Sequence, residues 1–134
     1  MDKIREVTLR ERRTEKDVSI LVAKIDDEGD LVLEGYDVGE APREFWGDDD
    51  YEYYRVIKRE YKDTVLRWLI KERFDTDTDL RVWLDKKGIP SRVIEKNYSD
   101  TILLWLIKDR FDTDTDFKLW LDKKGIPNQF WSWV

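Results

Sequence analysis

The chain has 134 residues, of which 40% are hydrophobic and 42% charged, and its formal net charge is −6. It contains neither cysteine nor histidine, which excludes disulfide frameworks, zinc sites with nitrogen or sulfur ligands, cysteine nucleophiles and Ser-His-Asp triads. The many aromatic residues argue against disorder, and the absence of a long apolar run and of a signal-peptide core predicts a soluble, cytoplasmic protein without membrane contact.

The first 60 residues have the alternation and the turn residues of an antiparallel β-meander. We expect four strands there: Lys3–Arg12, Val18–Ile25, Leu31–Tyr36 and Tyr51–Arg59. The second of these is β-branched and apolar and is the predicted central strand. A turn that contains Gly29 is expected to join it to the third strand as a hairpin.

The second half of the chain repeats itself after 37 residues. Between Tyr61 and Arg92, 23 of 32 positions are identical to the positions 37 residues later. Similarity of this kind most simply indicates a recent tandem duplication. A residue shared by the two copies is therefore not, by that fact alone, evidence of a function.

Each copy has the pattern of two helices followed by a strand. Asp63 and its counterpart are expected to cap the first helix, and Asp79 and its counterpart to cap a short second helix. A Gly-Ile-Pro sequence then ends each pair. The segments that follow, Arg92–Lys96 and Gln129–Val134, align with the fourth strand and are predicted to be strands as well.

The predicted fold is α+β, with the order β-β-β-β-αα-β-αα-β. An antiparallel β-meander is followed by two tandem αα units, each packed on the same face of the sheet and each followed by a strand. We expect a single domain over residues 1–134. Its predicted parts are a β-meander (1–60), duplicated β-α-α units (55–91 and 92–128) and a terminal strand (129–134).

One difference between the copies bears on packing. Arg67 in the first copy is replaced by Leu104 in the second, which creates an unbroken apolar run from Ile102 to Ile107. A helix that is apolar most of the way round is buried on more than one side. Either the second helix pair lies between the sheet and the first pair, or it forms a subunit interface; we favour a monomer over a homo-oligomer.

Negative charge is concentrated between Asp26 and Glu52. Twelve acidic residues and a single basic one, Arg43, give this segment a net charge of −11. A field of this sign repels phosphate backbones and attracts basic proteins, so we expect no nucleic-acid partner. The segment is interpreted either as solvated turns and strand edges, or as a docking surface for a basic protein partner or a mimic of nucleic-acid charge.

The two segments Asp75–Asp79 and Asp112–Asp116 both read Asp-Thr-Asp-Thr-Asp, like the start of an EF-hand calcium loop. The glycine that such a loop needs at its sixth position is replaced by Leu80 or Phe117, and the glutamate at its twelfth by a lysine. The competing interpretation is that these acids stabilise the positive end of the following helix.

The sequence points to no catalytic machinery. Any two of the 31 acidic residues can come together as the pair that a carboxylate-based hydrolase needs, but no pair is singled out. No glycine-rich phosphate loop is present. We therefore predict no catalytic, cofactor-binding or metal-binding residues and no cofactor.

The aromatic residues are mostly interpreted as core. Four tryptophans recur at helix-core spacing: Trp68, Trp83, Trp105 and Trp120. In the terminal strand, alternation places Trp131 and Trp133 on one face, and Phe130 and Ser132 on the other. The alternative for this last group is a platform on which a ligand stacks.

Two signatures resemble those of a known group of proteins. The first comprises Leu31-Val32-Leu33-Glu34-Gly35, Glu44-Phe45-Trp46-Gly47 and Tyr51-Glu52-Tyr53; the second is Gly125-Ile126-Pro127 followed by Phe130-Trp131-Ser132-Trp133. Together they resemble an uncharacterised family of small bacterial proteins, a domain of unknown function. This chain differs in carrying two helix-pair units where such proteins have one. The resemblance implies a bacterial, cytosolic setting and supplies no activity and no functional residues.

The function that these observations favour is a non-catalytic protein-interaction or regulatory module that acts through its acidic segment. This choice follows by elimination, because the residues of most catalytic centres are missing. A calcium-responsive module that uses Asp75–Asp79 and Asp112–Asp116, and a carboxylate-based hydrolase, are the alternatives.

Overall fold

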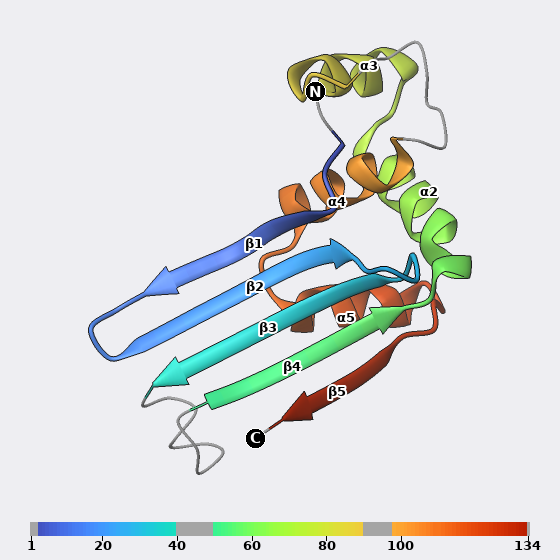
Figure 1. Ribbon diagram of the computed structural model, residues 1–134. Helices are drawn as coiled ribbons and strands as arrows, with labels where there is room; N and C mark the ends of the chain where they lie inside the picture. Colours follow the sequence, from blue (N-terminus) through green and yellow to red (C-terminus); the bar gives the residue numbers. More distant parts are fainter. Residues whose placement is uncertain (1–2, 40–49, 90–97, 134) are drawn as a thin grey trace.

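The computed structural model describes residues 3–39, 50–89 and 98–133 (Figure 1). These residues form a five-stranded antiparallel sheet and four α-helices, which build a helical layer on one side of the sheet. The strands are β1 (Glu6–Arg13), β2 (Asp17–Ile25), β3 (Leu31–Gly39), β4 (Asp50–Ile57) and β5 (Gln129–Trp133). The helices are α2 (Lys62–Arg73), α3 (Asp77–Lys86), α4 (Ser99–Arg110) and α5 (Asp114–Lys123), with a short 3₁₀ helix, η1 (Arg59–Tyr61), before α2.

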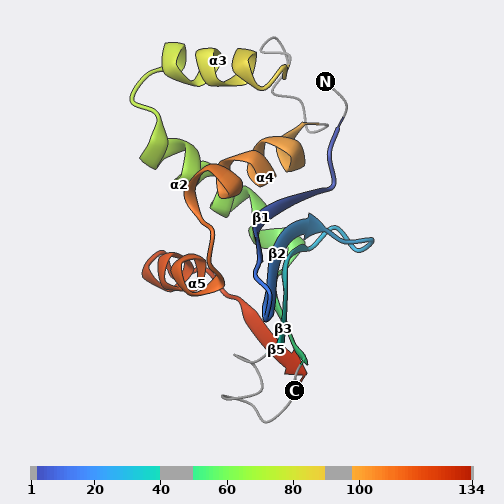
Figure 2. The ribbon, with the colours of Figure 1, turned by 90° about the vertical axis from the view of Figure 1, so that its left-hand side faces the viewer.

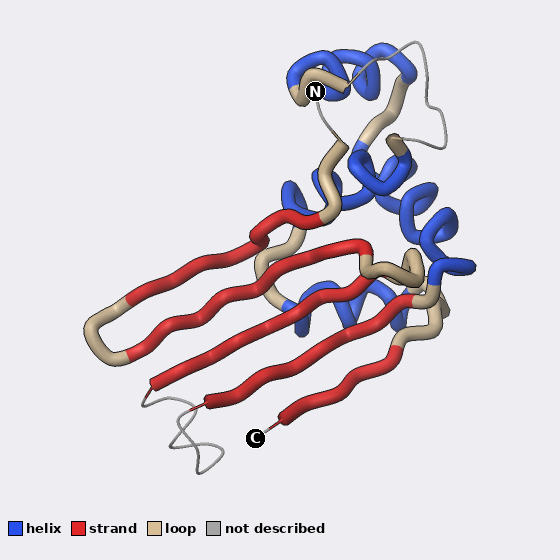
Figure 3. The backbone as a smooth tube through the Cα atoms, viewed as in Figure 1, coloured by secondary structure: helices blue, strands red, loops and turns tan. Residues whose placement is uncertain are grey.

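The strands lie in the order β1-β2-β3-β4-β5, and each is antiparallel to its neighbour (Figure 3). The α+β class and the meander are confirmed, and the terminal strand is found as β5. Three strand ends differ from the prediction by two residues or more: β1 begins at Glu6 and not at Lys3, β3 continues to Gly39, and β4 stops at Ile57. The buried carboxylate of Asp30 accepts the backbone N–H of Arg59 at 2.8 Å, where the chain has left the sheet for η1. The predicted strand Arg92–Lys96 lies outside the described residues.

The sheet has two different faces. The helices lie on one side of it, which we call the covered face; the other side is the open face (Figure 2). Side chains alternate between the two. The covered face buries apolar side chains of the inner strands, namely Leu21, Ala23, Ile25, Leu31, Leu33 and Ile57.

A β-bulge in β1 adjusts this alternation. Thr8 pairs with Val22 and Arg10 pairs with the next residue of β2, Leu21, so Leu9 is the extra residue. As a result Leu9, which is buried, and Arg10 both lie on the covered face. Bulges re-aim side chains in this way; here the bulge brings the Arg10 guanidinium to the helices.

The helix caps correct two predictions. Helix α3 begins at Asp77 and α5 at Asp114, and the caps are the hydroxyls of Thr76 and Thr113, each of which accepts a backbone N–H three residues later at 3.1 Å. The cap predicted at Asp79 is therefore wrong by three residues. In Asp-Thr-Asp-Thr-Asp both residue types can cap, and the earlier threonine is the one used. Asp63 is likewise not a cap. It lies in the first turn of α2, where its negative charge stabilises the positive end of the helix dipole.

Helix α4 is the centre of the helical layer. Six of its residues are buried, Leu104 completely, and the helix contacts β1, β2 and α2. It therefore lies between the sheet and α2, which is the first of the two arrangements predicted from its apolar run. The equivalent residue of α2, Arg67, is exposed.

Gly35 in β3 is required by the ring that lies over it. A Cβ at this position would lie 1.9 Å from Cζ of Tyr53, which faces Gly35 across the β3–β4 pair. The buried ring in turn contacts Tyr51 and Phe130, with centroids 5.4 and 6.2 Å away. Gly35 thus makes room for an aromatic cluster at the β5 side of the covered face.

We predict that Gly35→Ala destabilises the fold by about 1–3 kcal/mol, because the new methyl group displaces the Tyr53 ring. Urea denaturation followed by tryptophan fluorescence measures the change. In a Tyr53→Ala background the same substitution should cost little, because the obstacle is gone. Equal costs in both backgrounds would show that the ring is not the cause.

Candidate functional site

Arginines of the covered face bind the N-terminal end of α5. Arg55 is only 4% exposed, and its Nε and Nη2 donate to the two carboxylate oxygens of Asp114 at 2.7 and 2.9 Å. Arg10 donates to the backbone oxygen of Asp112 at 2.9 Å, and Arg12 forms an ion pair with its carboxylate at 3.8 Å. Bidentate charge-assisted pairs of the first kind are strong and directional. The second Asp-Thr-Asp-Thr-Asp segment therefore attaches its helix to the sheet.

The two Asp-Thr-Asp-Thr-Asp segments do not bring three or more acidic side chains together as a calcium site requires. Among the described residues, a set of three or more acidic side chains with ligand atoms within 4.8 Å of one another occurs at Asp26, Glu28 and Asp30, and in neither Asp-Thr-Asp-Thr-Asp segment. The first of those segments, Asp75–Asp79, is exposed. Calcium binding by these segments stays an untested alternative.

At the β2–β3 turn, the carboxylates of Asp26 and Asp30 accept hydrogen bonds from other groups of the protein. Asp26 Oδ1 accepts the backbone N–H groups of Glu28 and Asp30, both at 2.9 Å. The Asp30 carboxylate accepts from the Arg59 N–H at 2.8 Å and from Lys58 Nζ at 3.5 Å. A hollow of about 390 Å³ borders these residues. Asp26 thus closes the turn, and the Asp30 carboxylate joins the turn to the start of η1.

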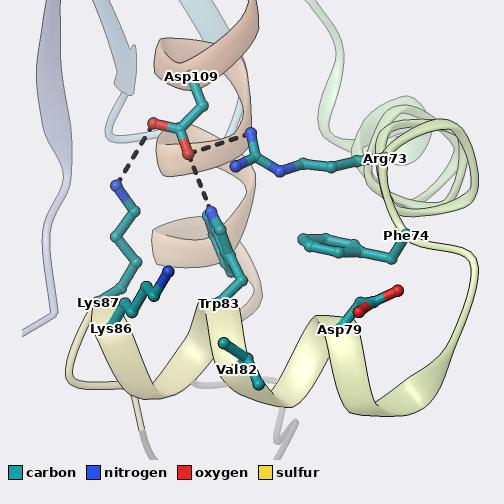
Figure 4. A pocket seen from close by; sticks show the side chains of 8 residues that line it. All are labelled: Arg73, Phe74, Asp79, Val82, Trp83, Lys86, Lys87 and Asp109. Atoms are coloured by element: carbon teal, nitrogen blue, oxygen red, sulfur yellow. Dashed lines mark hydrogen bonds and ion pairs between the residues drawn. The ribbon is translucent and has the colours of Figure 1, made fainter.

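A second hollow, of about 360 Å³, lies where α3 meets α4 (Figure 4). It is lined by Arg73, Phe74, Asp79, Val82, Trp83, Lys86, Lys87 and Asp109. Asp109 of α4 accepts Trp83 Nε1 at 2.9 Å and pairs with Arg73 at 3.2 Å and Lys87 at 3.4 Å. Two of the three cations of this hollow are thus already paired with a carboxylate of the protein, which ties α2 and α3 to α4.

The same arrangement occurs a second time with the roles of the helix pairs exchanged. Glu72 of α2 accepts Trp120 Nε1 at 2.7 Å and Arg110 at 2.6 Å, and pairs with Lys124. Every member of this group lies 37 residues from its counterpart: Glu72 and Asp109, Arg73 and Arg110, Trp83 and Trp120, Lys87 and Lys124. Each helix pair therefore inserts one carboxylate among three donors of the other, as the two halves of an isologous interface do.

The two groups differ by one methylene. Aspartate is shorter than glutamate, and the arginine contact of Asp109 is longer than that of Glu72, 3.2 against 2.6 Å. The ammonium group of Lys124, then the indole N–H of Trp120 and the guanidinium of Arg110 lower the pKa of Glu72 to about 2. The tighter group thus holds its carboxylate ionised down to acidic pH.

The open face of the sheet is both apolar and acidic. Directly paired residues share a face, and the pairings place ten apolar or aromatic residues there: Val18, Ile20, Val22, Val32, Tyr36, Val38, Tyr54, Val56, Trp131 and Trp133. The charged residues of this face are Glu6, Glu11, Glu34, Asp50 and Glu52, against Arg13 and Lys24, a net charge of −3. No helix of the described residues covers it (Figure 2).

Two titrating groups of this face, Lys24 and Tyr54, lie beside its acidic residues. The pKa of Lys24 is raised, mainly by its hydrogen bond to Glu34. Burial, then the charges of Glu34 and Glu52, raise the pKa of Tyr54, whose hydroxyl donates to Glu52 at 3.3 Å. Acidic charge is thus set directly beside the aromatic rings.

The tryptophans divide between core and surface. The core prediction is confirmed for the helices, where Trp83 and Trp120 are buried and Trp68 and Trp105 pack against the core. It is wrong for β5, where Trp131 is 51% and Trp133 67% exposed. The predicted alternation holds, but these two rings lie on the face that no helix covers. Trp46 lies outside the described residues.

Trp133 lies directly opposite Glu52, and Trp131 opposite Tyr54. Sequence reasoning missed Glu52 as a site residue because it is 81 positions from Trp133, and the register that joins them depends on the helices in between. The alternation in Tyr51-Glu52-Tyr53-Tyr54 and in the terminal strand was the available signal.

Comparisons with known proteins found no matching family model, curated protein or solved structure. In the part of the chain that the structure describes, no helix is long and apolar enough to cross a membrane.

We predict that Glu72→Gln lowers the free energy of unfolding at pH 7 by about 1 kcal/mol, a value reduced by the partial exposure of the pair. Because the folded pKa of Glu72, about 2, is below its ordinary value of 4.5, this stability is present above pH 4.5 and is lost as the pH falls towards 2. Urea denaturation between pH 7 and 2 should show the two proteins converging at acidic pH.

The control is Glu15→Gln, a change at an exposed residue between β1 and β2, which should leave the pH profile of the wild type unaltered. A Glu72→Gln variant whose stability stayed parallel to the wild type at every pH would contradict the assignment.

Proposed function

We propose that this protein is a non-catalytic protein-interaction module whose partner docks on the open face of the sheet. One observation carries the proposal: two tryptophans of β5, Trp131 and Trp133, are half or more exposed on the face without helices. Exposed tryptophan is enriched at the centres of protein interfaces, where it contributes most to binding. The aliphatic side chains of β2, β3 and β4 extend the same surface.

Charge favours a basic partner. The open face carries −3 and the chain −6, so association with a cationic surface is steered and accelerated, whereas an acidic partner is repelled. The acidic segment Asp26–Glu52 contributes Glu34, Asp50 and Glu52 to this face. Residues 40–49 of that segment lie outside the described residues and are not needed for the proposal.

The hollows give less support to a carboxylate-based hydrolase. In the two described above that contain several acids, Asp109 is held by three donors, and Asp30 has donors on both of its oxygens. These contacts engage both carboxylates in holding the fold together, so neither is singled out as a general base. We therefore favour the interaction module over the carboxylate-based hydrolase.

We also propose that the α4–α5 pair arose by duplication of α2–α3 in a bacterial, cytoplasmic protein. The reciprocal groups around Glu72 and Asp109 support this, because two copies of one unit meet in the isologous way that two identical chains would. A single unit would leave its carboxylate, and the apolar residues Val65, Leu66 and Leu69 of α2, without their partner helix.

We predict that tagged wild-type protein retains a stoichiometric basic partner from a lysate of its host, and that a Trp131→Ser/Trp133→Ser variant loses it. Binding should weaken between low and high salt, because the attraction is partly electrostatic. Quantitative mass spectrometry of the retained proteins makes the comparison.

The matched control is Val82→Ser/Leu119→Ser, which removes two apolar side chains of similar exposure, 47% and 52%, from the helices. This variant should retain the partner. A wild-type sample with no stoichiometric partner, or a partner held equally by the β5 variant, would count against the proposal.

Deleting residues 92–128 tests the duplication. We predict that the shortened chain, with one helix pair and β5, forms a homodimer in which the units of two chains make the reciprocal Glu72 contact. Light scattering coupled to size-exclusion chromatography gives its mass. A folded, monomeric deletion protein would contradict the prediction.

A further inference from the structure

We infer that the partner adds a β-strand to β5 and places arginine or lysine side chains, at alternate positions, over Trp131 and Trp133 beside Glu52. This inference rests on the proposed function and names the chemistry of the partner: an extended basic segment of another protein. It follows from the state of the two sheet edges, from the register of β5, and from contacts that the chain already makes.

The two edge strands of the described sheet are built differently. Strand β1 has a bulge and five charged residues, Glu6, Arg10, Glu11, Arg12 and Arg13. Charges and bulges are the features that keep an edge from pairing. Strand β5, Gln129–Trp133, has no charge, no proline and no bulge, and all five residues are exposed. Its outer edge is therefore the one open to strand addition, in which backbone hydrogen bonds supply affinity.

The register then fixes which partner side chains matter. In an added strand, two residues separated by one position would lie beside Trp131 and Trp133 on the open face. Glu52 of β4 is directly opposite Trp133 of β5. Its carboxylate accepts one hydrogen bond, from Tyr54 at 3.3 Å, which leaves most of its lone pairs unused. A long cationic side chain can cover the indole and reach this carboxylate.

The protein already builds this combination from its own residues. Lys124 lies 4.2 Å from the Trp68 ring centre, and Lys87 lies 4.7 Å from that of Trp105. The same two lysines pair with Glu72 and Asp109. Each group thus joins a cation, an indole and a carboxylate. On the open face Trp133 supplies the ring and Glu52 the carboxylate, and the partner supplies the cation. We expect this cation to contribute the binding free energy typical of a cation–π contact.

A second copy of this chain fits the surface less well. Strand β5 offers no cation to its own tryptophans, and both copies would bring an open face of charge −3. Like charges at a contact oppose association. A basic extended segment satisfies the backbone edge, the rings and the carboxylate together.

The experiment uses the full-length protein and three synthetic hexapeptides. The basic probe is acetyl-Val-Arg-Val-Arg-Val-Arg-amide. The acidic probe has glutamate in place of each arginine, and the broken probe has proline in place of the central valine, which removes a backbone donor and disfavours pairing. Isothermal titration calorimetry gives affinities, and the indole N–H signals in ¹H–¹⁵N NMR spectra show which tryptophans are contacted.

We expect the basic probe to bind, to shift the Trp131 and Trp133 signals, and to bind more weakly at high salt. Trp133→Ala and Glu52→Gln should each weaken it by about tenfold, since each removes one charge-dependent contact. The Val82→Ser/Leu119→Ser protein should bind like the wild type. Glu52→Gln changes no buried side chain, so it remains informative should the tryptophan variant fold poorly.

Four results would overturn the inference. Equal binding of the broken probe would show attraction by charge without strand addition, and equal binding of the acidic probe would show that cations are not selected. A dimer that dissociates in Trp133→Ala would assign the edge to a second copy. No binding of the basic probe, with a Trp131/Trp133-dependent partner still captured from the lysate, would refute the added basic strand and leave the proposed function standing.

Discussion

The buried pair Arg55–Asp114 organises the molecule. A guanidinium that is 4% exposed needs a carboxylate and further acceptors, because an unpaired buried charge is costly. Asp114 supplies two oxygens and Asn128 a third, at 2.7 Å from Nη1. Both partners flank the same piece of chain, α5 and the turn after it. The pair therefore positions α5 on the covered face and places the residues that follow it beside β4. There the Arg55 guanidinium lies over the Phe130 ring, 4.9 Å from the ring centre.

This arrangement shows how one sequence serves two environments. The segment Asp112–Asp116 binds three arginines of the sheet, whereas the identical segment Asp75–Asp79 is exposed at the start of a helix that lies away from the sheet (Figure 2). What the two helix pairs share is their contact with each other through Glu72 and Asp109. A fold with a single sheet thus accommodates two like units, because one of them packs mainly on the other.

Local patterns predicted the elements, and distant pairings were beyond them. Alternation located the strands and helical periodicity the helices, since both depend on neighbouring residues. The apolar run around Leu104 also predicted that α4 is covered on several sides. The caps were misassigned because Thr76 and Asp79 both suit the position. Arg55 and Asp114 are 59 residues apart, so no pattern joins them. Alternation placed Trp131 and Trp133 on a common face, but whether helices cover that face depends on how the whole chain is arranged.

The bulge and charges of β1 have a consequence for assembly. A sheet with two receptive margins can recruit strand after strand and grow without limit, which is the route to fibres. Here the charges and the bulge of β1 oppose pairing at one edge, whereas β5 at the other edge has neither, so the two edges of the sheet are not equivalent. An assembly that grows by adding strands to this sheet therefore ends at β1, and this edge limits how many strands are added.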